Sequence, residues 1–151
     1  MTYQEKQSIT SIIAILVAAG AYSVFAIQNG YFALPETDIS GMAWALIVFV
    51  LFQIATQIAA HIILATVEAG LQAGRKNPNK KFDKLDEREK IVNGKGERYG
   101  NYVHMALIFA GVIIVALQGD VSVLFIAIGL GGILAGILSE ALKLYFSKRG
   151  A

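Results

Sequence analysis

The side chains that could do chemistry inside an apolar segment gather in the second apolar stretch of the chain. They are Gln53, Gln57, His61 and Glu68. At about 100° per residue they project within an arc of roughly 80°, so they form one polar stripe on a helix, interrupted by Leu64. Because imidazole titrates near physiological pH, the stripe could act as a proton or ion relay. The interpretation that we favour is interhelical hydrogen bonding, in which these side chains hold helices together.

Three polar side chains in later apolar stretches are candidates to face this stripe, namely Asn101, His104 and Glu140. At about 1.5 Å per helical residue, Asn101 and Glu140 fall at the level of His61, and His104 lies roughly one and a half turns away. His61, His104 and Glu140 are suitable metal ligands, but they come from three separate helices and no local motif supports a site. A haem between His61 and His104 conflicts with their different levels. We therefore expect no cofactor, and the metal alternative stays open.

Catalytic signatures are not recognisable in the sequence. The chain has no cysteine, which excludes disulfides, thiolate metal sites and Cys nucleophiles. No acid–base pair or activated nucleophile stands out. Gly94, Gly96 and Gly100 have the spacing of neither a dinucleotide fingerprint nor a Walker A loop, and they predict a flexible joint instead. We expect a protein that is not an enzyme.

The elements that must position these residues are membrane spans. Of the 151 residues, 56% are hydrophobic and only 16% charged, with a mean hydropathy of +0.58. A chain this short cannot bury so much apolar surface, which excludes a soluble enzyme, a free nucleic-acid-binding domain and a disordered tail. Crossing a hydrocarbon core of about 30 Å takes about 20 helical residues. The stretches that qualify are 8–28, 41–63 with helical character to 70, 99–118 and 121–142.

Backbone groups in lipid must be paired within the chain, which favours helices for these four stretches. The predicted fold is all-α: a single domain that forms an antiparallel bundle of four transmembrane helices. The connections at 29–40, which turns at Asn29-Gly30, and at 119–120 contain no Lys or Arg. All 13 basic residues lie in the loop 71–98 or near the two termini. By the positive-inside rule, we expect a multi-pass protein of the cell (inner or plasma) membrane, with both termini and the loop in the cytoplasm.

The loop 71–98 ends in a charged segment. Between residues 82 and 92 the spacing places Phe82, Leu85 and Val92 on one side, which predicts a cytoplasmic amphipathic helix between the second and third spans.

The run Leu85–Ile91, followed by Lys95–Tyr99 and an apolar span, resembles a pattern in small predicted prokaryotic membrane proteins of uncharacterised families. Those proteins have four helices and an Asp-Glu-Arg-rich stretch before the third span. The resemblance covers roughly residues 83–103. It implies a prokaryotic inner-membrane protein and carries no activity.

The fourth predicted span is rich in small residues. Gly129, Gly132 and Gly136 let another backbone approach closely, and the last two form a small-xxx-small pattern. These glycines could serve a hairpin with the third span or an interface between subunits.

The sequence predicts a non-enzymatic membrane protein that acts by association, as an accessory or regulatory subunit of a membrane complex. Its partners would be the lipid bilayer and either further copies of the chain or another membrane protein, and no nucleic acid. The expected cytoplasmic contact surface consists of Lys80, Lys81, Lys84, Asp86, Glu87, Arg88, Lys90 and Arg98. The alternative is a small oligomeric transporter or channel subunit for ions, protons or small solutes, which uses the polar stripe.

Overall fold

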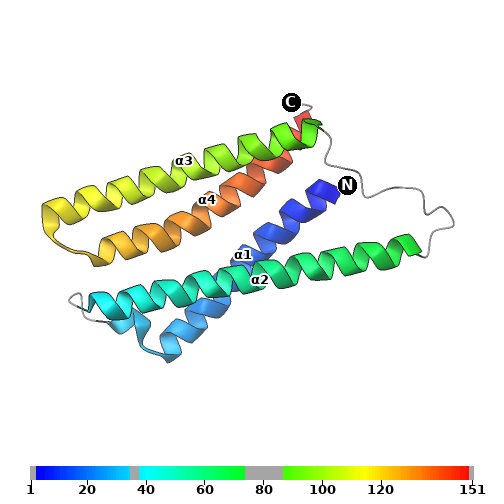
Figure 1. The fold of residues 1–151 in the computed structure, drawn as a ribbon. Helices are drawn as coiled ribbons and strands as arrows, with labels where there is room; N and C mark the ends of the chain where they lie inside the picture. The colour runs from blue at the N-terminus through cyan, green and yellow to red at the C-terminus, as the bar shows by residue number, and fades with distance from the viewer. Residues whose placement is uncertain (1–2, 35–37, 74–86, 150–151) are drawn as a thin grey trace.

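The structure, a computed structural model, describes residues 3–34, 38–73 and 87–149, without the side chains of residues 72, 73, 87–89 and 149. The described chain is all-α (Figure 1). Its elements are α1 (Tyr3–Gln28), the short 3₁₀ helix η1 (Tyr31–Ala33), α2 (Ile39–Ala73), α3 (Glu87–Gln118) and α4 (Ser122–Arg149). The four α-helices are each long and apolar enough to cross a membrane. This confirms the prediction of an all-α chain with four candidate spans and suggests a multi-pass membrane protein.

The helices are separated by turns at the residues that suit them. Gly30 has φ of 71° and Gly119 has φ of 77°, in the left-handed region that glycine adopts without strain. At the start of α2 the backbone N–H of Gly41 donates to Asp38 Oδ1 at 2.8 Å. Before α4 the backbone N–H of Ser122 donates to Asp120 Oδ1, also at 2.8 Å. Each carboxylate satisfies a backbone donor that a helix start leaves free.

Helix α3 begins at Glu87 and runs without a break through three glycines, so the flexible joint predicted at Gly94–Gly100 is wrong. The reason is close packing. A Cβ added at Gly96 would lie 2.8 Å from the backbone oxygen of Ser139, and one added at Gly100 would lie 2.8 Å from that of Ala135. These glycines let α3 approach α4 closely. Residues 87–92 of the predicted amphipathic helix belong to α3, and residues 82–86 lie outside the described residues.

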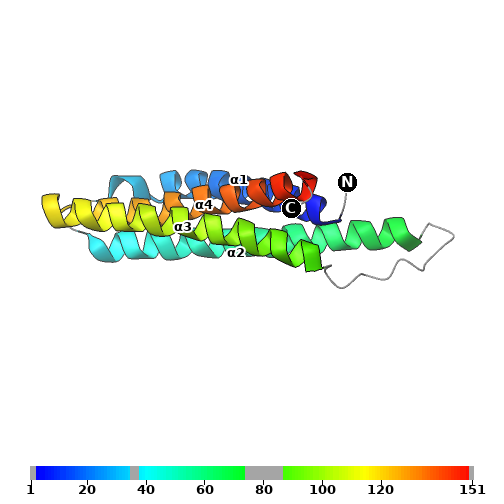
Figure 2. The ribbon, with the colours of Figure 1, turned by 90° about the horizontal axis from the view of Figure 1, so that it is seen from above.

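The four helices pack as two neighbouring pairs. Helix α3 lies along α4, helix α1 packs against α2, and α1 also packs against α4, which joins the pairs (Figures 1 and 2). Helix α2 touches α4 over a smaller area. The first turn of α1 and the last turn of α4 lie at the same end of the molecule (Figure 1). We call this the charged end and the opposite one the turn end.

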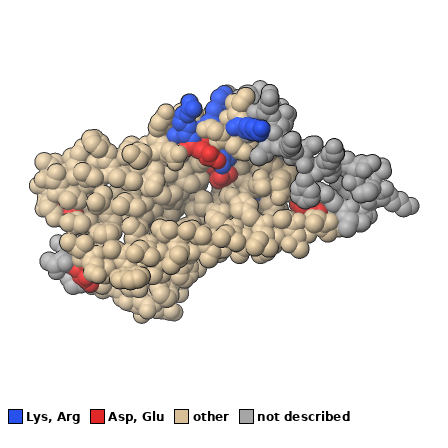
Figure 3. Space-filling model, viewed as in Figure 1, with Lys and Arg blue, Asp and Glu red and all other residues tan. Residues whose placement is uncertain are grey.

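Charged side chains are concentrated at the charged end. In Figure 3 the Lys and Arg side chains gather at one end over α3 and α4, and uncharged side chains cover most of the rest of the described surface on the face shown. The acidic side chains described at the turn end are Asp38 and Asp120, which cap the helices there.

The core follows one face of α1. Its buried residues recur at spacings of three and four as far as Ala18, as in a helix-packing seam, and Ala26 follows on the same face. Those on the seam are Gln4, Ser8, Ser11, Ile15, Ala18 and Ala26, and Ala14 is buried beside them. The first three are polar and lie toward the charged end, whereas the others are apolar. The seam of α1 is therefore polar toward the charged end and apolar toward the turn end.

Candidate functional site

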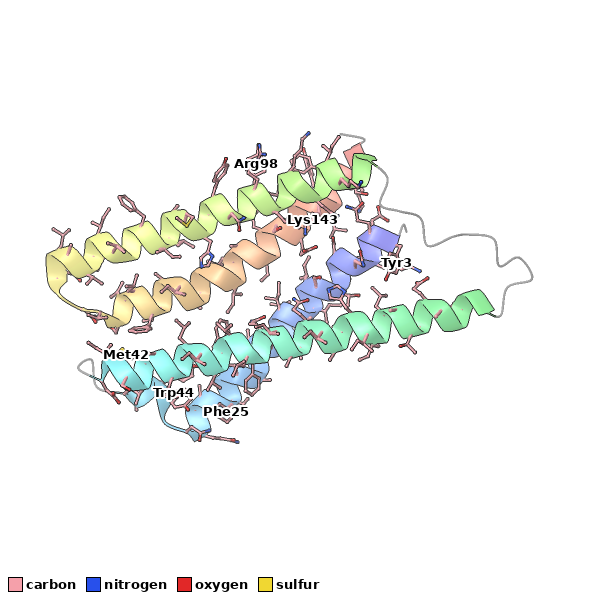
Figure 4. All side chains as sticks on the ribbon, in the orientation of Figure 1. Tyr3, Phe25, Met42, Trp44, Arg98 and Lys143 are labelled. Carbon is pink, nitrogen blue, oxygen red and sulfur yellow. The ribbon has the colours of Figure 1, made fainter. Side chains whose placement is uncertain are left out.

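A polar pocket of about 170 Å³ lies at the charged end, where all four helices contribute to its wall. The lining side chains are Gln4, Gln7, Ser8 and Ser11 from α1, His61 from α2, Asn93 from α3, and Glu140 and Lys143 from α4. Figure 4 labels Lys143 on α4 and Tyr3 on the first turn of α1, near the helix ends that flank the pocket.

Hydrogen bonds around the pocket tie α1 to two other helices. Gln4 Nε2 donates to Asn93 Oδ1 at 2.8 Å, which links α1 to α3. Ser11 Oγ lies 3.2 Å from His61 Nε2, within hydrogen-bond distance. One turn along α2, Gln57 Nε2 donates to the backbone oxygen of Ser11 at 3.2 Å. Ser11 is therefore the point on α1 at which two side chains of α2 are held.

Ion pairs border the same region. Lys143 Nζ donates to Glu140 Oε1 at 2.8 Å and lies 3.4 Å from Glu97 Oε1. The Lys143 and Glu140 side chains are only 11% and 16% exposed, so each compensates the other's loss of water. Lys6 of α1 pairs with Glu68 of α2. All of these pairs lie at the charged end. Lys6–Glu68 connects α1 to α2 and Lys143–Glu97 connects α4 to α3, whereas the pair of Lys143 with Glu140 lies within α4.

The predicted stripe on α2 faces α1 for most of its length. Three of its members contact α1 residues, which is the arrangement that interhelical hydrogen bonding requires. Gln57 and His61 are within hydrogen-bond distance of Ser11, and Glu68 pairs with Lys6. The remaining member, Gln53, has a buried Nε2 without a hydrogen-bond partner among the described residues.

The structure brings one of the three predicted facing residues to the stripe. Glu140 shares the polar pocket with His61. Asn101 is exposed on α3. His104 lies against α4, where a Cβ added at Gly131 would be 3.2 Å from its Cδ2, and within the described chain its buried Nε2 has no partner. The expected meeting of Asn101 with His61 at one level is therefore not seen.

The metal and haem alternatives gain no support from this geometry. Among the described residues, no group of three or more His, Asp or Glu side chains is placed to hold a metal ion. His61 Nε2 bonds to Ser11 of α1, whereas His104 packs on α4. The two imidazoles therefore do not face a common position.

The glycines of α4 face three different helices of the same chain. Gly136 meets Ile15 of α1, where an added Cβ would lie 2.9 Å from Ile15 Cδ1. Added Cβ atoms at Gly132 and Gly129 would approach His104 of α3 and Leu46 of α2, at 4.0 and 3.8 Å. Gly136 is therefore the one of these three positions where a side chain would clash, and at Gly129 and Gly132 an added Cβ would make ordinary van der Waals contact.

The predicted contact surface is described in part. Lys90 and Arg98 are exposed on α3, and the Lys95 ammonium lies 5.6 Å from the centre of the Phe146 ring. Tyr99 stacks on the same ring at 6.4 Å between centroids. Lys80, Lys81, Lys84 and Asp86 lie outside the described residues, and Glu87 and Arg88 lie on α3 without described side chains.

A second, apolar cavity of about 530 Å³ lies toward the turn end, between α1, α2 and α4. Tyr22 and Phe49 meet edge to face in its wall at 5.1 Å between ring centroids. The Tyr22 hydroxyl donates to the backbone oxygen of Ala45 at 3.0 Å. This cavity lies beside the apolar part of the α1 seam. The Lys, Glu and His side chains that line either cavity are all in the polar pocket.

Sequence reasoning missed most of the pocket. It did not single out Gln4, Gln7, Ser8, Ser11, Asn93 or Lys143 as site residues. The signal that could have revealed three of them is the spacing of Gln4, Ser8 and Ser11, which continues as buried Ile15 and Ala18. A polar run in register with an apolar seam indicates a buried polar face.

The chain matches no family model, and neither a curated protein nor a solved structure shows significant similarity to it. The resemblance of residues 83–103 to small prokaryotic membrane proteins therefore stays a prediction. The function is therefore inferred from the residues of this protein alone.

Proposed function

We propose that the chain is a non-enzymatic integral membrane protein that acts by association, as an accessory or regulatory subunit of a membrane complex. In this proposal α1–α4 form an antiparallel transmembrane bundle. The described basic side chains gather at the charged end, which by the positive-inside rule supports a cytoplasmic position for that end and for both termini. The corresponding location is the cell membrane, the inner membrane if the protein is prokaryotic.

The observation that carries the proposal is the helical extension of α3 beyond the predicted span. It presents Lys90, Lys95 and Arg98 on a continuous helix that Gly96 and Gly100 hold against α4. Contact residues fixed in this way lose less conformational freedom on binding than those of a flexible loop. The extension therefore suits recognition of a partner surface with complementary charge. We name the exposed side chains of Lys90, Lys95 and Arg98 the basic face, beside which the Glu97 side chain is also exposed.

Aromatic residues beside the basic face support a position at the membrane interface. Tyr99, Tyr102 and Tyr145 are exposed, and Tyr and Trp side chains favour this level of a bilayer. Each basic residue near an anionic leaflet adds about 1 kcal/mol of attraction. The lipid surface would thus hold the basic face at the depth where a membrane protein partner or a further copy of the chain could contact it.

Charge reversal on the basic face tests the association. The variant Lys95→Glu/Arg98→Glu should lose at least about 80% of a co-purifying partner from native membranes, and mass spectrometry can measure this. The control, Lys95→Arg/Arg98→Lys, keeps both charges and should retain the partner. Equal recovery with both variants would overturn the proposal.

The alternative function, an oligomeric transporter or channel subunit, receives less support from the contacts of the stripe. Three of its four members bond to α1 within the chain, so those polar atoms are not free to line a pathway between subunits. Ion or proton flux in proteoliposomes that depends on His61 and Glu68 would restore this alternative.

A further inference from the structure

The polar pocket at the charged end is not used by the proposed function, and its wall is built from buried polar groups. Gln4, Ser8 and Ser11 are only 6%, 3% and 8% exposed. Its volume of about 170 Å³ is well above the ~10–15 Å³ that a single water needs. The pocket is therefore large enough for a small organic molecule.

Several lining groups lack a protein partner. Among the described residues, neither the Gln7 amide nor the Ser8 hydroxyl forms a hydrogen bond, although both line the pocket. Gln4 and Asn93 use one donor and one acceptor on each other, which leaves the Gln4 carbonyl and the Asn93 amino group available. The lining groups that the protein leaves available are both donors and acceptors, so a solute that carries both kinds of group can bond to them.

The charges of the pocket compensate one another. The Lys143 ammonium lies 2.8 Å from the Glu140 carboxylate, and the pocket wall holds no other Lys, Arg, Asp or Glu. The Lys and Glu side chains of the wall therefore carry no net charge together. An ion would either break this pair or remain without a counter-charge in a region of reduced solvation, and both are unfavourable. The wall therefore favours an uncharged occupant.

Apolar packing borders the pocket along α1 toward the turn end. Beyond Ser11 the seam continues with buried Ala14, Ile15 and Ala18, and Ile15 meets Gly136 of α4 in close contact. This packing separates the polar pocket from the apolar part of the α1 seam. Such a geometry suits binding from the charged end.

We propose that this pocket binds a small uncharged solute with both hydrogen-bond donors and acceptors, of the amide or polyol class. The amide groups of Gln4, Gln7 and Asn93 and the hydroxyls of Ser8 and Ser11 recognise it. The Lys143–Glu140 pair stays intact at the edge of the pocket. This site uses none of the side chains of the basic face, so solute binding would be a second function besides association.

Saturation-transfer NMR on the purified full-length chain in detergent tests the site, with acetamide and glycerol as uncharged probes. Acetate and methylammonium serve as charged probes of similar size. We expect saturable signals from acetamide, glycerol or both, and none from the charged probes. The variant Ser8→Val should weaken binding at least tenfold, since it replaces the hydroxyl and fills part of the pocket. The control Ser23→Val, on the exposed side of α1, should bind as the unchanged protein does.

Three results would overturn the proposal. They are the absence of a saturable signal from both uncharged probes, equal binding by the Ser8→Val and Ser23→Val variants, and equal signals from the charged probes. If Ser8→Val does not fold, Gln7→Leu removes an unpartnered amide from the same wall and should weaken binding likewise. Unchanged binding by Gln7→Leu would then refute recognition by these groups.

Discussion

Replacing Gly100 by alanine tests how closely α3 and α4 approach each other. An added Cβ would lie 2.8 Å from the backbone oxygen of Ala135 and 2.9 Å from Ser139 Cβ. Neither atom is the tip of a flexible side chain, so the two helices must separate to accept the methyl group. Overpacking of this kind costs about 1–3 kcal/mol.

The same replacement at Gly94 gives a matched control. Gly94 lies on the same helix, and a Cβ added there would meet nothing within 4 Å. Alanine is favoured over glycine in a helix by about 1 kcal/mol, at both positions. Gly94→Ala should therefore gain about 1 kcal/mol of stability. At Gly100 the clash should offset that gain or exceed it by up to about 2 kcal/mol.

Thermal unfolding of both variants in one mild detergent measures the difference. The free energies of unfolding should differ by about 1–3 kcal/mol, and each kcal/mol shifts Tm by about 2–4 °C in a chain of this size. Gly100→Ala should thus melt below Gly94→Ala. An equal rise in Tm for the two variants would refute the close approach of α3 and α4.

Three further predictions follow from the turns, the seam and the charge distribution. Gly119→Ala should lower the free energy of unfolding by about 1–2 kcal/mol, because an L-residue is strained at φ of 77°. The control Gly20→Ala has open space around it, and its unfolding should show no such loss. Ser11→Ala removes the hydrogen bond to the imidazole of α2 and should cost only about 0.6 kcal/mol, typical of such bonds in membranes; a loss above about 2 kcal/mol would contradict this. Since the chain has no cysteine, an impermeant maleimide should label Asp120→Cys in intact cells and Lys95→Cys only after permeabilisation, and the reverse pattern would contradict the orientation.

The four helices could be predicted because runs of about 20 apolar residues are a strong signal that needs no tertiary information. The continuous helix at the start of α3 could not be predicted, because glycines in a sequence can indicate either a flexible joint or a close contact between helices. Only the position of α4 decides between them, and at Gly96 and Gly100 the contact is present. His61 and Glu68 mark α2 as a candidate site because ionisable side chains are rare in apolar segments. Ser8 and Ser11 give no such signal, because serine is only weakly polar. Their burial depends on three other helices, which local pattern cannot show.

The seam on α1 also has a consequence for how the protein is made. Membrane proteins insert as they are synthesised, and N-terminal segments emerge first. In the transmembrane bundle that we propose, helix α1 enters the membrane before α4, which supplies Glu140, Lys143 and much of the cover for the polar half of the seam. Until then Gln4, Ser8 and Ser11 lack that cover, and α2 can engage Ser11 alone. The first helix of the chain thus completes its packing only when the last one arrives, which makes biogenesis of α1 sensitive to truncation or delay at α4.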